Sequence, residues 1–380
     1  MPAKKLTRID LEPARGLSVL FVFGFHLLGV TIGMQNLPWD GLTRNLHFDL
    51  GWSLLPFTPF TLGWHGVAVF FGISGYCIQL SWLQGDRSWR HFGMRRFYRL
   101  FPTYLVWLLI FALLAWFLPK VFTFSCDKTQ FVSHLLLIHN WSGQTLWGIN
   151  PSFWSIAVEI QLYALLPVLI WMVHKLGWGR ALAVTALIEV LFRFPWKWLF
   201  DLEIGDYLLG ANVLGVTFAY WFSWSIGAWV ASRQYAGASQ PLAKVPLAAA
   251  VSLVIICWYF KPLSDFSFLA ASFATCVWIS KKLVLAEKQE EGPVGMGGET
   301  RNIFYRILAV MGSCSYSLYL LHQPLLVAFH TLFIRDLSIH TAAKMMIHLG
   351  VLLPVLTLIA YGSYRLIEMP TALWGRKRKT

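Results

Sequence analysis

Long apolar runs alternate with short polar segments along almost the whole chain. A helix needs about 20 mostly apolar residues to cross the hydrocarbon core of a bilayer. The pattern therefore predicts an all-α, polytopic integral membrane protein with about ten transmembrane helices, both of whose termini are cytoplasmic. The expected spans lie near 15–35, 61–82, 96–119, 152–174, 180–194, 212–232, 244–260, 265–281, 310–334 and 343–368.

Composition and charge support this class of protein. Hydrophobic residues make up 57% of the chain and charged residues only 13%, against about 25% in soluble domains. The net charge of +13 does not indicate nucleic-acid binding, because the basic residues are spread between the apolar runs. With a cytoplasmic N-terminus, most of the 31 lysines and arginines fall in inside segments, as the positive-inside rule requires.

We expect residues 1–380 to form one transmembrane domain. The segments 36–60 and 120–150 are predicted outer loops, and the Gly- and Glu-rich segment 283–302 is predicted to be a flexible cytoplasmic linker. The five cysteines have neither a disulfide framework nor metal-ligand spacing, so no metal is expected. Membrane lipids are the expected surroundings, and no pattern indicates an oligomeric state.

Ionisable side chains occur inside several apolar runs. His26 follows Arg15 by eleven residues, which places it roughly 16 Å above the inner surface. The same counting places Glu159, Glu189 and His322 near the bilayer centre. A charged group there costs about 2.5–3.5 kcal/mol, so such residues usually face a cavity or one another. Each is either part of a functional site or a hydrogen-bonding group that joins two helices.

Arginines gather where the third span begins, in the stretch "MRRFYRLFPTY". Arg96 and Arg99 are three residues apart and share a helix face, and Arg95 adjoins them. Arg15 opens the first span at the same level. These residues are either ordinary positive-inside anchors or a cationic pocket for a multiply phosphorylated ligand, because guanidinium groups suit phosphates.

Six stretches that follow one another along the chain form a recognisable set: "LEPARGLSVLFVFGFH", "HGVAVFFGISGYCI", "MRRFYRLFPTY", "PSFWSIAVEIQLYALLP", "SYSLYLLHQPLL" and "YGSYRLIEMP". Together, and in this order, they resemble the acyltransferase-3 family of membrane O-acyltransferases. Two features depart from that family's usual pattern: Glu12, Pro13 and Ala14 precede Arg15, and Ala68 stands where many members carry an acidic residue.

The resemblance implies a donor and an acceptor. The donor is a cytoplasmic acyl-CoA, most often acetyl-CoA, whose phosphates Arg15, Arg95, Arg96 and Arg99 would hold. The acceptor is a hydroxyl group, usually on a cell-surface glycan such as a lipopolysaccharide O-antigen, or on its lipid-linked precursor. The family is commonest in bacteria, so the resemblance implies the bacterial inner membrane.

His26 is the expected general base, with Glu159 orienting its ring and stabilising the imidazolium. A direct transfer and an acyl-enzyme at His26 are both compatible with the sequence.

Four further residues are candidates for contact with substrate. Ser74 could donate to the developing oxyanion, although a Ser-Gly pair also serves helix packing. His322 lies in the same predicted layer as His26. Asp49 and His65, near the outer surface, are candidates for hydrogen bonds to the acceptor.

Two other functions compete with acyl transfer. Mid-membrane His and Glu residues also serve proton-coupled secondary transporters, although the sequence lacks the paired half-repeats that many of these show. A non-catalytic scaffold or flippase partner would not explain why His26 occurs together with a cluster of arginines at the inner surface.

Overall fold

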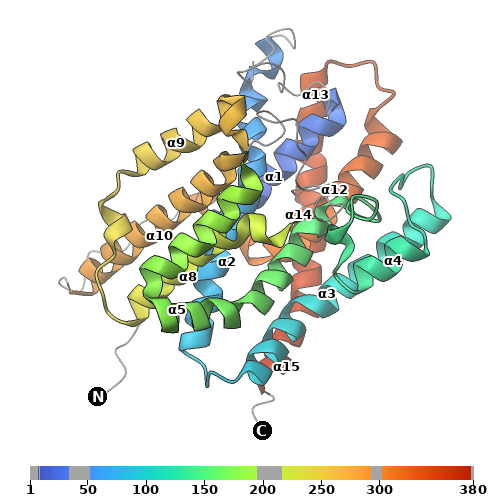
Figure 1. Ribbon diagram of the computed structural model, residues 1–380. Helices are drawn as coiled ribbons and strands as arrows, with labels where there is room; N and C mark the ends of the chain where they lie inside the picture. The colour runs from blue at the N-terminus through green and yellow to red at the C-terminus, as the bar shows by residue number, and fades with distance from the viewer. Residues whose placement is uncertain (1–6, 8, 34–51, 195–215, 292–301, 378–380) are drawn as a thin grey trace.

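A computed structural model describes residues 7, 9–33, 52–194, 216–291 and 302–377. These residues form a bundle of helices, without a β-strand among them (Figure 1). The α-helices are α1 (Glu12–Ile32), α2 (His65–Leu83), α3 (Trp89–Phe117), α4 (Lys128–Leu135), α5 (Trp154–Arg193), α8 (Trp221–Tyr235), α9 (Leu247–Tyr259), α10 (Ser267–Glu291), α11 (Ile303–Ser313), α12 (Ser315–Phe329), α13 (Thr341–Ile347), α14 (Leu353–Ser363) and α15 (Met369–Lys377).

Short 3₁₀ or π-helical segments precede, join or extend several of these helices. The 3₁₀ segments are η3 (Trp52–Trp64), η4 (His139–Trp141), η5 (Pro151–Phe153), η7 (Thr217–Tyr220), η8 (Pro241–Lys244) and η9 (Lys261–Phe266), and the π-helical segments are η10 (His330–Ile334), η11 (His348–Leu352) and η12 (Tyr364–Glu368).

Seven helical segments within the described ranges are long and apolar enough to cross a membrane. This confirms an all-helical fold for the described residues, with seven candidate membrane-spanning helices, whereas the count of ten and the cytoplasmic termini stay predictions. One of the seven, 151–193, covers two predicted spans, and its helix breaks at Gly177, where φ is 76°. The predicted span 244–260 corresponds to α9, which is apolar but shorter.

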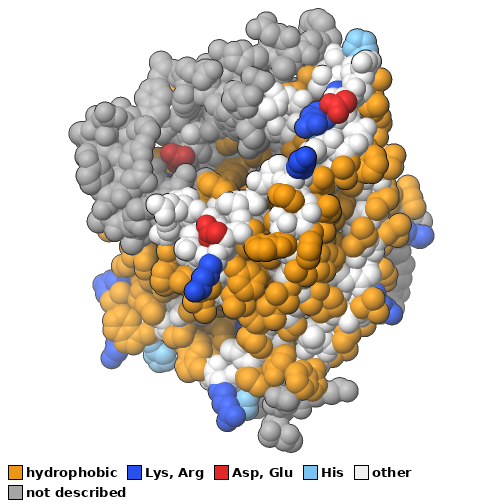
Figure 2. Space-filling model, turned by 90° about the vertical axis from the view of Figure 1, so that its right-hand side faces the viewer, with side chains coloured by type: hydrophobic (Ala, Val, Ile, Leu, Met, Phe, Trp, Pro, Cys, Tyr) orange, Lys and Arg blue, Asp and Glu red, His pale blue; other side chains and the backbone are white. Residues whose placement is uncertain are grey.

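Among the described residues on the face shown in Figure 2, hydrophobic side chains predominate and charged side chains are sparse. Exposed large apolar residues occur along many of the helices, and examples are Trp116, Trp171, Leu187, Leu358 and Leu366. Apolar surface on this scale is unusual in soluble proteins and marks contact with a membrane.

The helix α2 lies at the centre of the bundle and packs against α1, α8 and α10 (Figure 1). Glycines allow its backbone to approach its neighbours closely. A Cβ atom on Gly75 would lie 1.9 Å from the carbonyl oxygen of Trp224 in α8, and one on Gly227 would lie 2.2 Å from that of Gly72. Small residues at such contacts are typical of membrane helices.

Part of the predicted linker 283–302, residues 283–291, is helical in the structure. Helix α10 continues to Glu291, and Asn302 caps α11 by accepting a hydrogen bond from the Tyr305 backbone N–H. Residues 283–291 extend the helix because Leu, Ala, Glu, Lys and Gln are good helix formers. The remaining residues, 292–301, lie outside the described ranges.

The predicted outer loop 36–60 also contains ordered structure. The segment η3 packs on α1, where the Phe60 ring covers Gly24 and meets the ring of Phe21 edge to face. The apolar character of 52–64 explains why this part packs against the helix. Residues 36–51 of the loop lie outside the described ranges.

The predicted outer loop 120–150 contains the short helix α4 and a buried pair of histidines. The rings of His134 and His139 stack with centroids 3.8 Å apart. His134 Nδ1 donates to the Gln130 carbonyl, and the Tyr104 hydroxyl donates to the carbonyl of His134. Burial lowers the pKa of His134 from 6.5 to about 4, so its ring is neutral at pH 7.

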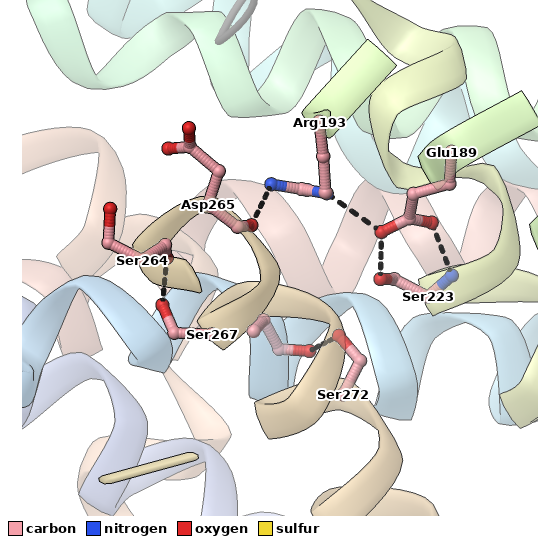
Figure 3. A network of polar contacts seen from close by, with 8 residues as sticks. Glu189, Arg193, Ser223, Ser264, Asp265, Ser267 and Ser272 are labelled. Atoms are coloured by element: carbon pink, nitrogen blue, oxygen red, sulfur yellow. Dashed lines mark hydrogen bonds and ion pairs between the residues drawn. The ribbon is translucent and has the colours of Figure 1, made fainter. Parts of the chain in front are cut away.

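Glu189 and Arg193 form a buried ion pair on α5 (Figure 3). Arg193 Nε lies 3.0 Å from a Glu189 oxygen, and its Nη1 donates to the carbonyl of Asp265 at 2.9 Å. The Glu189 carboxylate also accepts hydrogen bonds from the backbone and hydroxyl of Ser223. Glu189 therefore ties α5 to α8 and, through Arg193, to η9.

Candidate active site

A cavity of about 830 Å³ runs into the bundle beside α2. On this helix its lining extends from Val67 to Ser81, which corresponds to roughly 21 Å along the helix axis. One end lies at the turn that joins α2 to α3, and the other is lined by Phe70, Ser155 and Tyr319. The cavity thus crosses much of the roughly 30 Å that the hydrocarbon of a bilayer measures.

All four arginines singled out in the sequence line this cavity. Arg96 donates to the Ser81 hydroxyl at 2.6 Å, and Arg15 lies 3.2 Å from Glu12. Arg95 Nη1 is 3.9 Å from Asp86. Arg95 Nη2 and Arg96 Nε are buried and have no hydrogen-bond partner within the described part of the chain. Because these two nitrogens lack an acceptor, the end of the cavity that carries the arginines is suited to bind an anion.

Glu159 lines the middle of the cavity. Its Oε1 accepts a hydrogen bond from the Ser74 hydroxyl at 2.7 Å and another from the Tyr163 hydroxyl. Trp224 Nε1 from α8 reaches the Ser74 oxygen at 3.4 Å. Ser74 thus faces the cavity while its neighbour Gly75 faces α8, so the Ser-Gly pair serves both the cavity and helix packing.

His26 lies beside His322, with the two ring centroids 5.1 Å apart. Neither residue lines the cavity. His322 stands three residues, or about one helical turn, beyond Tyr319, which forms the deep end. The sequence placed His26 and His322 in one layer, and the structure brings their rings side by side about one turn beyond the cavity.

Of the remaining predicted site residues, Glu159 lies in the cavity but is bonded to Ser74 and Tyr163. Within the described structure, no hydrogen bond joins Glu159 to His26. His65 is buried at the start of α2, where its Nε2 lies 2.9 Å from the Ser267 hydroxyl, and it does not line the cavity. Asp49 lies outside the described residues.

Tyr163, Tyr319 and Glu368 are among the cavity residues that were not predicted from the sequence. Tyr163 follows Glu159 by four residues on α5, and Tyr319 precedes His322 by three on α12. Both spacings put the tyrosine on the same helix face as the residue already singled out, so helical periodicity could have identified them. Glu368, a carboxylate at the end of the last apolar run, lines the cavity and accepts a hydrogen bond from Ser317 at 3.2 Å.

The helical fold, the apolar outer face and the deep cavity with four arginines at one end indicate a multi-pass membrane protein with an internal cavity. A family model described as an acyltransferase domain matches residues 8–365. The chain belongs to this family, the acyltransferase-3 family.

Two individual proteins are similar over shorter stretches. Acyltransferase MdmB from Streptomyces mycarofaciens is 30% identical over 207 residues, which are 51% of this chain and 49% of that protein. Regulator of hypoxia-inducible factor 1 from Caenorhabditis elegans is 29% identical over 135 residues, which are 32% of this chain and 26% of that protein. The chain thus spans about half of the first relative and about a quarter of the second. No solved structure matches the chain.

Proposed function

We propose that this protein transfers an acyl group, most simply acetyl, from cytoplasmic acyl-CoA to a carbohydrate hydroxyl, with His26 as the general base. One observation carries the proposal: a single cavity extends from four arginines to within one helical turn of the His26–His322 pair. Membership of the acyltransferase-3 family supports the same chemistry.

The basic end of the cavity suits the donor. CoA carries several phosphate groups, and guanidinium forks bind phosphate oxygens through paired hydrogen bonds. The buried, unpartnered nitrogens of Arg95 and Arg96 are the groups that a phosphate would satisfy. The pantetheine arm then follows α2 inward and brings the thioester to the deep end at Tyr319.

The chemistry is an acyl substitution at the thioester carbonyl. His26 takes the proton of the acceptor hydroxyl as that oxygen bonds to the carbonyl carbon. The carbon–sulfur bond breaks, and CoA leaves as a thiolate, which then receives the proton held by His26. A positioned base of this kind contributes about 10²–10⁴-fold to the rate.

The acceptor is a glycan hydroxyl, on a cell-surface polysaccharide such as an O-antigen or on its lipid-linked precursor, in a bacterial inner membrane. This part of the proposal rests on the family resemblance. No observation favours the alternative of a proton-coupled transporter.

The proposal is tested by incubating purified protein with acetyl-CoA and a glycan acceptor and by measuring free CoA and acetylated product. We expect His26→Ala to lower turnover by about 10²–10⁴-fold, because the base is lost. His174→Ala, which removes an exposed histidine of α5, is the matched control and should keep wild-type activity. Full activity in folded His26→Ala would reject the assignment of the base.

A second prediction concerns the donor site. Arg96→Gln should raise the KM for acetyl-CoA by about tenfold or more while kcat changes little, because one charged hydrogen bond to a phosphate is worth about 1.5–3 kcal/mol. Arg90→Gln is the control, since Arg90 is exposed and does not line the cavity. An equal change in KM for both variants would show that only general surface charge is involved.

A further inference from the structure

The aromatic neighbours of His26 are Phe25, which precedes it in α1, and His322 of α12. The two imidazole centroids lie 5.1 Å apart, with the ring planes inclined by 47° to each other. His322 is fully buried, whereas His26 is half-buried. The pair therefore has one enclosed member and one accessible member.

The tautomer of neutral His322 follows from its hydrogen bonds. Its Nδ1 lies 2.6 Å from the backbone oxygen of Tyr319. A carbonyl oxygen can only accept a hydrogen bond, so Nδ1 must carry the proton. In a neutral ring the other nitrogen, Nε2, then carries a lone pair and can only accept.

Among the described residues, the hydrogen-bond contact of that lone pair is a long one to a hydroxyl group. The Ser152 hydroxyl lies 3.4 Å from Nε2, but it donates its hydrogen to the Gln323 side-chain oxygen at 2.6 Å. An acceptor without a donor inside a buried site is costly. The ring of His26 lies beside His322 and carries an N–H group that can act as a donor.

We propose that His322 is a positioning residue for His26: its Nε2 accepts the N–H of the His26 ring and so leaves the other His26 nitrogen unprotonated. This inference rests on the proposed function, in which that nitrogen takes the proton of the acceptor hydroxyl. The same hydrogen bond stabilises the imidazolium formed during transfer, because hydrogen bonds from charged donors are the stronger ones.

This assignment replaces the one that the sequence suggested for Glu159. The Glu159 carboxylate is engaged by Ser74 and Tyr163 within the cavity and lies near enough to Arg15 to interact with it electrostatically. Glu159 therefore belongs to the cavity that we propose for the acyl donor. The residue that orients His26 in this proposal is His322, through its neutral imidazole.

The test compares two replacements of similar size, His322→Gln and His322→Met. Gln offers a side-chain oxygen as acceptor, whereas Met has no comparable acceptor. We expect Met to lower kcat about tenfold or more with the KM for acetyl-CoA unchanged, and we expect Gln to restore most of the loss. Wild-type kcat in the Met variant, or equal losses in both variants when both are folded, would overturn the inference.

A spectroscopic measurement gives an answer even if the variants fold poorly. Nitrogen-15 NMR of wild-type protein labelled at histidine, with His322 assigned by comparison with the Gln variant or by selective labelling, reports which ring nitrogen is protonated. We expect a protonated Nδ1 and an unprotonated Nε2 in His322, and the opposite tautomer would overturn the inference.

The His26→Ala variant in the same assay separates the two proposals. If the wild type releases no CoA, or if His26→Ala keeps full activity, the proposed function fails. If His26→Ala is inactive while His322→Met behaves as wild type, only the role of His322 fails.

Discussion

Arg193→Met is expected to destabilise the folded protein by roughly 3–5 kcal/mol. The change leaves the carboxylate of Glu189, which is fully buried, without its counter-charge. It also removes the hydrogen bond to the Asp265 carbonyl that connects α5 with the segment before α10. Removing one partner of a buried ion pair costs more than the pair itself contributes, because the remaining charge stays out of water.

The measurement is thermal or denaturant unfolding of the protein in detergent or nanodiscs, followed by tryptophan fluorescence. The double variant Glu189→Gln/Arg193→Met should recover much of the loss, because a neutral amide can keep hydrogen bonds to Ser223. Arg335→Met is the matched control, since the Arg335–Asp336 pair is exposed and such pairs contribute about 0–1 kcal/mol. A single Arg193→Met variant as stable as the control would show that this ion pair does not hold the helices together.

Gly75→Ala is expected to cost about 3 kcal/mol of stability and to reduce acyl transfer as well. The added methyl group would lie 1.9 Å from the Trp224 carbonyl oxygen, so the backbones of α2 and α8 must move apart. That movement displaces Ser74, which adjoins Gly75 and bonds both Glu159 and the Trp224 indole. Activity should therefore fall even at temperatures where the variant remains folded.

Gly93→Ala provides the comparison for this prediction. A Cβ at Gly93 of α3 would meet no atom within 4 Å, and alanine favours helix more than glycine does, so this variant should be neutral or slightly stabilising. Both variants are measured by unfolding and by CoA release at several temperatures. If Gly75→Ala matched Gly93→Ala in both assays, the close α2–α8 contact would not be a constraint on the site.

Much of the architecture follows from properties that are local in the sequence. An apolar run of sufficient length must become a helix in a bilayer, because no water is present there to satisfy the backbone hydrogen bonds. The rise per residue also sets the height of a side chain, which is why Arg15, Arg96 and Arg99 were expected at one level and all line one cavity. The quoted motifs predicted the family, and the match over residues 8–365 confirmed it.

The limits of the linker and the outer loops were harder to predict. Residues 283–291 and 52–64 are helical in the structure although their composition also suits a connection. In both segments, helix propensity or packing against a neighbouring helix decided the outcome, and the polar or Pro-rich pattern alone could not reveal it.

By itself, the sequence determined the class of protein and the family to which it belongs, and it predicted the heights of the ionisable side chains. Only the tertiary structure decided which side chains meet: His26 with His322, Glu159 with Ser74 and Tyr163, and Glu189 with Arg193 and Ser223. The physical reason is that counting residues along a helix gives a depth in the membrane. Which neighbour a side chain contacts depends on how each helix is rotated and packed against the others, and those packing contacts join residues far apart in the chain.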